Sequence, residues 1–170
     1  MKDLTKIKAC IFDVDGVLTG GEIIYTNGGE EAKVFNIKDG WAIVELKKLG
    51  FITGIITGRS SELVAKRAAE LKIDYLVQGE LKKLDAYERF KAQYGIKDEE
   101  IAYIGDDLID LPILVRCGFA ACPSDAVDEV KTRVDMVSRF VGGKGAVREM
   151  IEEILKAKNL WNSIVSDFCS

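Results

Sequence analysis

Two aspartates separated by one residue follow an apolar run at 7–12: Asp13 and Asp15, with Gly16 immediately behind them. If the backbone stays extended here, both side chains share a face, with their backbones about 7 Å apart. Two ionised carboxylates at that distance repel each other by roughly 2–3 kcal/mol at an effective dielectric of 20. A divalent cation, or a proton on one carboxyl, relieves this repulsion. The pair therefore indicates metal binding or acid–base chemistry, although an Asp-x-Asp-Gly stretch taken alone is as typical of a turn or strand-end cap.

A hydroxyl, a glycine and a lysine in two later segments could bind a phosphoryl group. Thr57 and Gly58 follow an apolar run at 51–56, and Lys83 comes after another at 74–78. A hydroxyl and a glycine amide at the start of a helix can donate to phosphoryl oxygens, and a fixed lysine can neutralise their charge. The alternatives are a helix N-cap for Thr57 and a solvated helix position for Lys83.

A third group of acids follows the apolar run at 101–105, namely Asp106, Asp107 and Asp110. Asp106 could join Asp13 in an oxygen site for Mg²⁺, which binds few carboxylates and keeps several waters. An acid-rich helix start is the alternative. It explains Asp107 well and the pair of Asp106 and Asp110 less well.

Short apolar runs alternate with helical patterns, and this alternation predicts how these residues are positioned. Strands are predicted at 7–12, 51–56, 74–78, 101–105 and 118–122, and helices at 39–50, 60–72, 82–95 and 107–118. The pattern predicts an α/β fold, a doubly wound, Rossmann-like parallel sheet with helices on both faces. Ligands of such a sheet bind beyond the carboxyl ends of the strands, where the residues above would meet.

Two segments depart from the alternation. The stretch 21–35 has two β-rich halves around an Asn-Gly-Gly turn, which predicts a β-hairpin flap over the strand ends. The tail, about 144–170, begins with a helix whose apolar face is predicted to pack in the core or on another subunit; that face contains Val147, Met150, Ile151, Ile154 and Leu155. The sequence contains no inserted cap domain, and residues 1–170 are predicted to form one domain.

The composition excludes several kinds of site and partner. The chain of 170 residues has a formal net charge of −4 and no histidine, so a metal would be held mainly by oxygen, which favours Mg²⁺, Ca²⁺ or Mn²⁺. The negative charge argues against nucleic acid as a partner. No run reaches the ~18 apolar residues of a membrane span, and Asp13 and Asp15 interrupt the first apolar stretch too early for a signal peptide. The four cysteines form no C-x-x-C, and a cytoplasmic protein with reduced thiols is expected.

The motifs resemble those of a known superfamily. The stretches "DVDGVLT", "ITGR" and "GDDLID", together with Lys83, are similar in type and order to the four motifs of the haloacid dehalogenase superfamily, over nearly the whole chain. More narrowly, "FNIKDG", "QGELKKL" and "GGKGAVRE" resemble its capless phosphatases that act on 3-deoxy-D-manno-octulosonate 8-phosphate in lipopolysaccharide precursor synthesis. The resemblance implies Mg²⁺-dependent hydrolysis of a sugar-acid phosphate through an aspartyl-phosphate.

The resemblance also assigns roles to individual residues. It implies that Asp13 is the nucleophile and that Asp15 is the general acid and base. It implies that Mg²⁺ is bound by the Asp13 carboxylate, the Asp15 backbone carbonyl and Asp106. The remaining implied roles are phosphate binding by Thr57, Gly58 and Lys83, and orientation of Lys83 and of the metal's waters by Asp107 and Asp110.

Substrate choice and assembly are further implications of the resemblance. Arg59 matches the octulosonate enzymes, whereas the related phosphatases of nine-carbon sugar acids have glutamate there; it could bind an acid sugar, or be a structural surface arginine. Relatives of this size close their sites by oligomerising, typically as homotetramers in which the flap and a neighbour's C-terminal segment border the pocket, and the resemblance implies the same assembly here. Gly20 and Gly21 stand where relatives commonly have Asp-Gly, so the resemblance does not say how the base of the flap is fixed.

Three alternatives remain open at the level of sequence. The chain could hydrolyse another sugar-acid phosphate, of the nine-carbon type, or a small phosphate. It could be a catalytically silent, phosphatase-like assembly module. It could also be a phospho-acceptor receiver domain, although such a domain has its acceptor on the third strand, whereas Asp13 follows the first.

Overall fold

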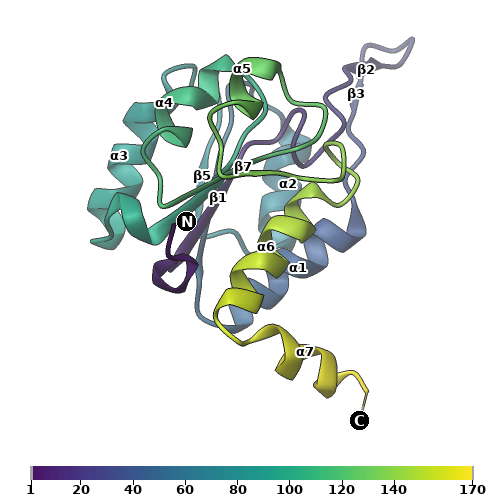
Figure 1. The fold of residues 1–170 in the computed structure, drawn as a ribbon. Helices are drawn as coiled ribbons and strands as arrows, with labels where there is room; N and C mark the ends of the chain where they lie inside the picture. Colours follow the sequence, from purple (N-terminus) through teal and green to yellow (C-terminus); the bar gives the residue numbers. More distant parts are fainter. Residues whose placement is uncertain (1, 170) are drawn as a thin grey trace.

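The computed structural model describes residues 2–169, in which six strands form one parallel sheet (Figure 1). The spatial order is β5-β4-β1-β6-β7-β8. The strands are β1 (Ala9–Phe12), β4 (Ile52–Ile56), β5 (Tyr75–Val77), β6 (Ile101–Ile104), β7 (Phe119–Cys122) and β8 (Met136–Val137). Strand β1 is central, and Phe12 at its end pairs with Ile55 on one side and Ile104 on the other. The chain therefore leaves β1 at the point where the strand order reverses, which is the usual ligand site of such sheets.

Helices cover both faces of this sheet, which confirms the predicted doubly wound fold. One face packs against α1 (Ile37–Lys48), α2 (Glu62–Glu70) and α6 (Ala146–Ala157), and the other against α3 (Lys83–Tyr94), α4 (Leu111–Leu114) and α5 (Asp128–Lys131). Side chains of β1 alternate between the two cores, with Cys10 and Phe12 in the first and Ile11 in the second. Burial on both faces explains why β1 is continuously apolar.

The structure also shows where the predicted elements were wrong or incomplete. The five predicted strands are present, and β8 is an additional strand of two residues, too short to produce a pattern. The helix predicted at 107–118 is instead a 3₁₀ turn, Leu108–Asp110, followed by the short α4. Short 3₁₀ turns also occur at Leu4–Lys6 and Asp98–Glu100. The tail forms two helices, because Asn159 takes a left-handed conformation (φ 59°) between α6 and α7 (Trp161–Asp167).

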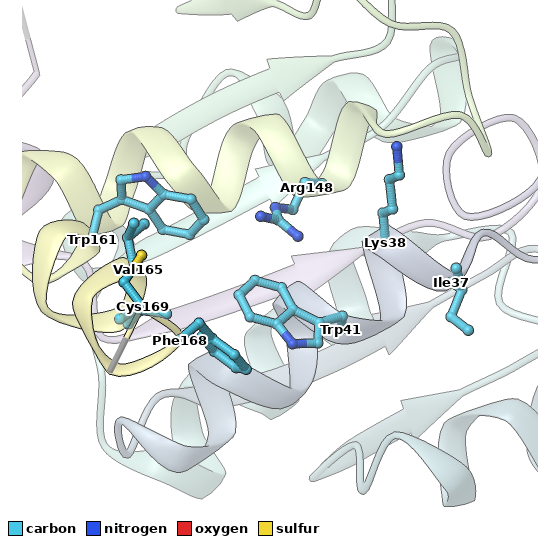
Figure 2. A pocket seen from close by; sticks show the side chains of 9 residues that line it. Ile37, Lys38, Trp41, Arg148, Trp161, Val165, Phe168 and Cys169 are labelled. Atoms are coloured by element: carbon cyan, nitrogen blue, oxygen red, sulfur yellow. The ribbon is translucent and has the colours of Figure 1, made fainter.

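The C-terminal helix α7 extends outward from the end of α6 (Figure 1), and its Trp161 contacts Trp41 of α1 edge to face, with ring centres 6.3 Å apart. Figure 2 shows Arg148 between the two tryptophans that join these helices, with its guanidinium carbon 4.2 Å from the ring centre of Trp41 and 5.1 Å from that of Trp161. Such cation–π contacts hold the helices together while leaving an apolar cavity of about 510 Å³ between them. Within residues 2–169, none of the helices combines the length and apolar character needed to cross a membrane.

The predicted flap is a hairpin of two very short strands, β2 (Ile24–Tyr25) and β3 (Glu31–Ala32), paired antiparallel. It projects from the body of the molecule beyond the carboxyl end of β1 (Figure 1). Several of its apolar side chains are exposed, including those of Ile23, Ile24 and Tyr25. The hairpin therefore depends for its position on contacts made by its charged side chains with the sheet edge.

The loop that follows β1 is in direct backbone contact with the turn before α6. Gly16 has a φ of +89°, and a Cβ on it would lie 2.0 Å from Oδ2 of Asp106. A Cβ on Gly142 would lie 1.9 Å from the carbonyl oxygen of Gly16, and the Gly143 amide donates to the Val17 carbonyl at 2.8 Å. Only glycine allows this approach.

Asp39 fixes the same region from α1, because its carboxylate accepts the Gly145 amide at 3.2 Å at the start of α6.

Candidate active site

Most of the predicted site residues meet at the carboxyl edge of the sheet. Asp13 directly follows β1, Thr57 directly follows β4, and Asp106 lies two residues beyond β6. Lys83 is the first residue of α3, and its ammonium group reaches Asp13 at the same edge. Because these strands are parallel neighbours, their ends converge there, as the order of apolar runs in the sequence predicts.

Lys83 forms the centre of a buried ionic cluster. Its Nζ lies 2.8 Å from Oδ1 of Asp13 and 2.7 Å from Oδ1 of Asp110, and Lys83 is only 1% exposed. Burial acts to lower the pKa of Lys83, but the charges of Asp13 and Asp110 outweigh it, so the pKa is raised. Lys83 is thus a fixed, charged ammonium group, and the solvated position weighed from the sequence does not apply.

Asp110 holds this cluster in place. Its Oδ1 also accepts the Tyr103 hydroxyl at 2.6 Å, and its Oδ2 accepts the backbone amides of Asp106 at 3.1 Å and Asp107 at 3.2 Å. Both oxygens of Asp110 are therefore used by donors of the protein. We call Asp13, Lys83, Tyr103, Asp106 and Asp110 the buried cluster. Tyr103 was not predicted, because a tyrosine in an apolar strand has no pattern that shows where its hydroxyl points.

The buried cluster has an excess of negative charge. Carboxylate oxygens of Asp13, Asp106 and Asp110 all lie within 4.8 Å of one another, and Lys83 is the one ammonium group bonded to them among residues 2–169. Burial, and then the neighbouring carboxylates, raises the pKa of Asp13 to about 7 and that of Asp106 to about 8. No side chain in the described part of the chain donates to Asp106. An all-oxygen site with this charge fits a hard divalent cation such as Mg²⁺, with Asp13 and Asp106 as the carboxylates that have oxygen atoms to offer.

Thr57 and Gly58 line a small cavity of about 190 Å³ together with Asp13, Asp15 and Arg59. Thr57 is 2% exposed. Its alternative role as a helix cap does not apply, because the N-cap of α2 is Ser61. Thr57 and Asp13 thus line one concave site, and Lys83 lies buried behind Asp13 at its wall.

Asp107 is the predicted residue that the structure does not bring to Lys83. Its side chain is exposed and accepts the amide of Leu108 at 2.7 Å, where it caps the 3₁₀ turn. The alternative of a helix-start acid therefore describes its contacts. Of the two acids expected to orient Lys83, the one in contact with it is Asp110.

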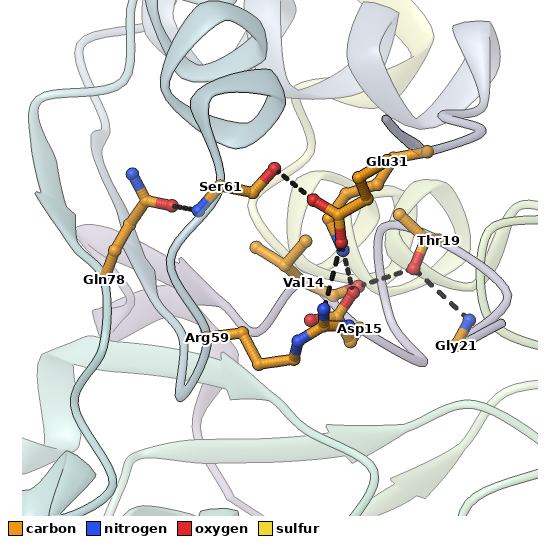
Figure 3. A network of polar contacts seen from close by, with 9 residues as sticks. Val14, Asp15, Thr19, Gly21, Glu31, Arg59, Ser61 and Gln78 are labelled. Atoms are coloured by element: carbon orange, nitrogen blue, oxygen red, sulfur yellow. Dashed lines mark hydrogen bonds and ion pairs between the residues drawn. The ribbon is translucent and has the colours of Figure 1, made fainter. Parts of the chain in front are cut away.

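A second charged network connects the flap to the site (Figure 3). The Nζ of Lys33 lies 2.5 Å from Oδ1 of Asp15 and 3.5 Å from Oε1 of Glu31. Glu31 in turn accepts Arg59 Nη2 at 3.1 Å through Oε1 and the Ser61 hydroxyl at 2.7 Å through Oε2. We call Asp15, Glu31, Lys33, Arg59 and Ser61 the flap rim.

Sequence reasoning missed Glu31, Lys33 and Ser61 in this network. The two flap residues have alternating charge just beyond the hairpin turn, a weak signal. The side chain of Lys33 is nonetheless only 2% exposed, which shows that the flap lies against the sheet edge.

Comparison with known proteins defines the class of protein first. Residues 75–151 match the haloacid dehalogenase-like hydrolase family. This segment includes Lys83, Asp106 and Asp110 of the buried cluster. The remaining motifs, around Asp13 and Thr57, lie on the strands beside it in the sheet. The fold is thus that of a haloacid dehalogenase-like hydrolase.

Individual relatives define the family more narrowly. The chain is 42% identical over 152 residues to the 3-deoxy-D-manno-octulosonate 8-phosphate phosphatase of Escherichia coli strain K12, covering 89% of this chain and 81% of that protein. The crystal structure of such a phosphatase from Moraxella catarrhalis, in complex with magnesium ion, phosphate ion and KDO, is 40% identical with a TM-score of 0.95 over 98% of this chain and 95% of that one. The cobalt-bound form from Haemophilus influenzae is 40% identical with a TM-score of 0.90, over 94% of each chain. The chain belongs to the family of 3-deoxy-D-manno-octulosonate 8-phosphate phosphatases.

Proposed function

We propose that the protein is a Mg²⁺-dependent phosphatase that hydrolyses 3-deoxy-D-manno-octulosonate 8-phosphate to the free sugar acid and phosphate, in lipopolysaccharide precursor synthesis. The observation that carries the proposal is the Asp13 carboxylate, held at 2.8 Å by a buried Lys83 at the end of the central strand. The relatives named above support the choice of substrate. The crystal structure of the Moraxella catarrhalis relative contains a magnesium ion, a phosphate ion and the sugar acid together.

Asp13 acts as the nucleophile in this proposal. A carboxylate oxygen of Asp13 forms a bond to phosphorus as the bond between phosphorus and the sugar oxygen breaks, which gives an aspartyl-phosphate. Asp15 donates its proton to the departing sugar oxygen. The Asp15 carboxylate then takes a proton from a water whose oxygen attacks phosphorus, and Asp13 is released as a carboxylate. The two-residue spacing lets one strand end supply both groups.

The other residues of the candidate site bind and orient the phosphoryl group. Lys83 and the Thr57 hydroxyl, with the Gly58 amide, bind its oxygens, while Asp110 and Tyr103 keep Lys83 in position. Mg²⁺ would be held by the Asp13 carboxylate, the Asp15 backbone carbonyl and Asp106, and would neutralise charge on Asp13 and on the phosphoryl oxygens.

The assembly and location complete the proposal. We infer a homotetramer in which the flap and the C-terminal segment of a neighbour border the pocket. The exposed apolar side chains of the flap at Ile23, Ile24 and Tyr25 support the participation of this hairpin in contacts between subunits. The cytoplasmic location expected from the sequence stays a prediction.

A phosphate-release assay over a panel of sugar phosphates, with and without Mg²⁺, tests the function. We expect the octulosonate 8-phosphate to have the highest kcat/KM and chelation of the metal to abolish turnover. Preference for a nine-carbon sugar-acid phosphate or for a neutral sugar phosphate would show that the substrate is wrong. Light scattering tests the assembly, and a fully active monomer would contradict it.

A further inference from the structure

Arg59, the cation expected to meet an acid sugar, already binds a carboxylate of the protein itself. Its Nη2 lies 3.1 Å from Oε1 of Glu31, while the second oxygen of Glu31 accepts the Ser61 hydroxyl at 2.7 Å. Figure 3 shows Glu31 reaching from the flap toward both residues. Two donors of different kinds thus take one oxygen each, as in a binding site for a carboxylate.

Ser61 shows that this arrangement is more than a chance surface ion pair. It is the N-cap of α2, a position from which serine normally bonds to the first amides of its helix, yet it makes no such bond. Its hydroxyl bonds to Glu31 instead, and its amide is held by Gln78 Oε1 at 2.9 Å. The hydrogen bond from Ser61 lowers the pKa of Glu31 the most, and the charges of Lys33 and Arg59 lower it further. The site therefore favours a charged carboxylate.

The Glu31 carboxylate is held by Arg59 and Ser61 weakly enough to be exchanged for another carboxylate. The side chains of Arg59 and Glu31 are 39% and 21% exposed, and ion pairs of this exposure contribute little net free energy. Glu31 stands on a strand of two residues, so its displacement breaks few interactions besides those with Arg59, Ser61 and Lys33. Arg59 also lines the cavity that contains Asp13 and Thr57, so a ligand with its phosphate at Asp13 has Arg59 within the same site.

We propose that Glu31 is a specificity-determining residue whose carboxylate occupies the Arg59–Ser61 site until the carboxylate of a sugar-acid substrate replaces it. The inference rests on the proposed function, because a sugar-acid phosphate brings a phosphate for Asp13 and a carboxylate for Arg59. One carboxylate replaces another, so Arg59 remains paired throughout. A neutral sugar phosphate has no group to exchange and leaves Glu31 in place.

Inhibition by the free sugar acid tests the exchange. Hydrolysis of p-nitrophenyl phosphate is measured with increasing 3-deoxy-D-manno-octulosonate, which has the carboxylate but no phosphate. Because Glu31→Gln removes the competing charge and retains the shape, we expect the inhibition constant of the sugar acid to fall about tenfold. Glu30→Gln is the matched control, since Glu30 is its exposed neighbour on the same hairpin, and it should leave the constant unchanged.

A double-mutant cycle shows whether the effect of Glu31→Gln on sugar-acid binding depends on Arg59. In the Arg59→Gln background, Glu31→Gln should bring no gain, because the site at which the two carboxylates compete is lost. An unchanged or higher inhibition constant in Glu31→Gln, or a gain that persists without Arg59, would overturn the inference. A mutation that merely disturbed the flap would weaken inhibition rather than strengthen it.

The two proposals can fail separately. If the octulosonate 8-phosphate is the preferred substrate but Glu31→Gln gives no gain, this inference is wrong and the proposed function stands. If the substrate panel shows no preference for a sugar-acid phosphate, the proposed function is wrong. In that case a tenfold gain of sugar-acid binding in Glu31→Gln would still support the carboxylate site.

Discussion

The buried cluster and the flap rim are both networks of alternating charge, but the protein builds them in different ways. The buried cluster stands on the ends of β1 and β6 and the start of α3, and Lys83 and Asp110 are 1% and 0% exposed. The flap rim joins a hairpin of two-residue strands to the loop after β4, and Arg59 and Glu31 in it are partly exposed. The first network is fixed by the sheet, and the second by its own contacts.

This difference in burial gives the two networks opposite electrostatics. In the buried cluster, desolvation and neighbouring carboxylates raise the pKa values of Asp13 and Asp106. In the flap rim, hydrogen bonds and cations lower the pKa of Glu31. A fixed, desolvated network suits a reaction that needs a constant geometry. A partly exposed pair such as Arg59 and Glu31 suits the exchange of one ligand for another.

The largest expected effect is on the reaction itself. Asp13→Asn should lower turnover of any phosphate ester by at least about 10⁴-fold, because it removes the attacking oxygen from the buried cluster. Steady-state phosphate release with Mg²⁺ present measures this. Retained activity would disprove the mechanism and, with it, the assignment of chemistry to the buried cluster.

Asp15 belongs to the flap rim yet is proposed to act in the chemistry, so its substitution tests the boundary between the two networks. Asp15→Asn should lower turnover of the sugar phosphate by about 10²–10⁴-fold, because the sugar oxygen leaves without a proton. With p-nitrophenyl phosphate the leaving group needs no proton, so a burst of nitrophenolate should precede a stalled second step. Stopped-flow absorbance measures the burst, and equal loss of the first step with both substrates would contradict the role of Asp15 as an acid.

The two networks should also differ in how much they contribute to the free energy of unfolding, an effect smaller than those on turnover. Lys83→Met leaves Asp110 and Asp13 buried without their cation, and we expect a loss of about 3–5 kcal/mol in the free energy of unfolding. Arg59→Gln removes an exposed cation from the flap rim and should cost less than about 1 kcal/mol. Urea unfolding of both variants without metal measures the difference. Equal losses would show that burial does not distinguish the networks.

The pH dependence of stability should have opposite signs in the two networks. The pKa values of Asp13 and Asp106, about 7 and about 8, lie above the ordinary value of about 3.9, so their stabilising effect is complete below that value and lost as pH rises through 7–8. The lowered pKa of Glu31 gives a contribution that is present above its unfolded pKa and lost in acid.

Thermal unfolding without metal should detect this dependence. The midpoint should fall by several degrees between pH 5 and pH 8.5, and Mg²⁺ should raise it more at the higher pH, where both carboxylates are charged. Asp106→Asn should flatten the profile, because it removes one of the two groups that take up a proton on folding. A profile that is unchanged in this variant would contradict the raised pKa of Asp106.

The sequence was sufficient to predict the sheet and most of the buried cluster. Each apolar run ends within one residue of the end of a strand, so Asp13, Thr57 and Asp106 could be placed at one edge, and the motif around Lys83 placed the ammonium group. Contacts at a distance in the chain could not be predicted. Tyr103 bonds to Asp110 only because the chain turns back after β6, and the alternation of strands and helices does not contain this turn.

The flap rim was predictable only in part. The Asn-Gly turn indicates a hairpin, but its strands have two residues each and so provide no pattern that fixes which side chains face the sheet. Glu31 lies 28 positions from Arg59, and their contact depends on how the hairpin lies against the protein. Arg59 was therefore expected either to bind an acid sugar or to be a structural surface arginine, and its pairing with Glu31 was not predicted.

The close contact between the Gly16 and Gly142 backbones fixes the base of the flap. No side chain separates the two backbones, so the chain from Gly16 to Thr19 is packed directly against the turn before α6. The flap is thus anchored beside the nucleophile, whereas its apolar side chains nearer the hairpin turn are exposed. The outer half of the hairpin could be lengthened or exchanged at small entropic cost. The residues that contact a substrate can therefore change while the catalytic residues beneath the flap stay the same.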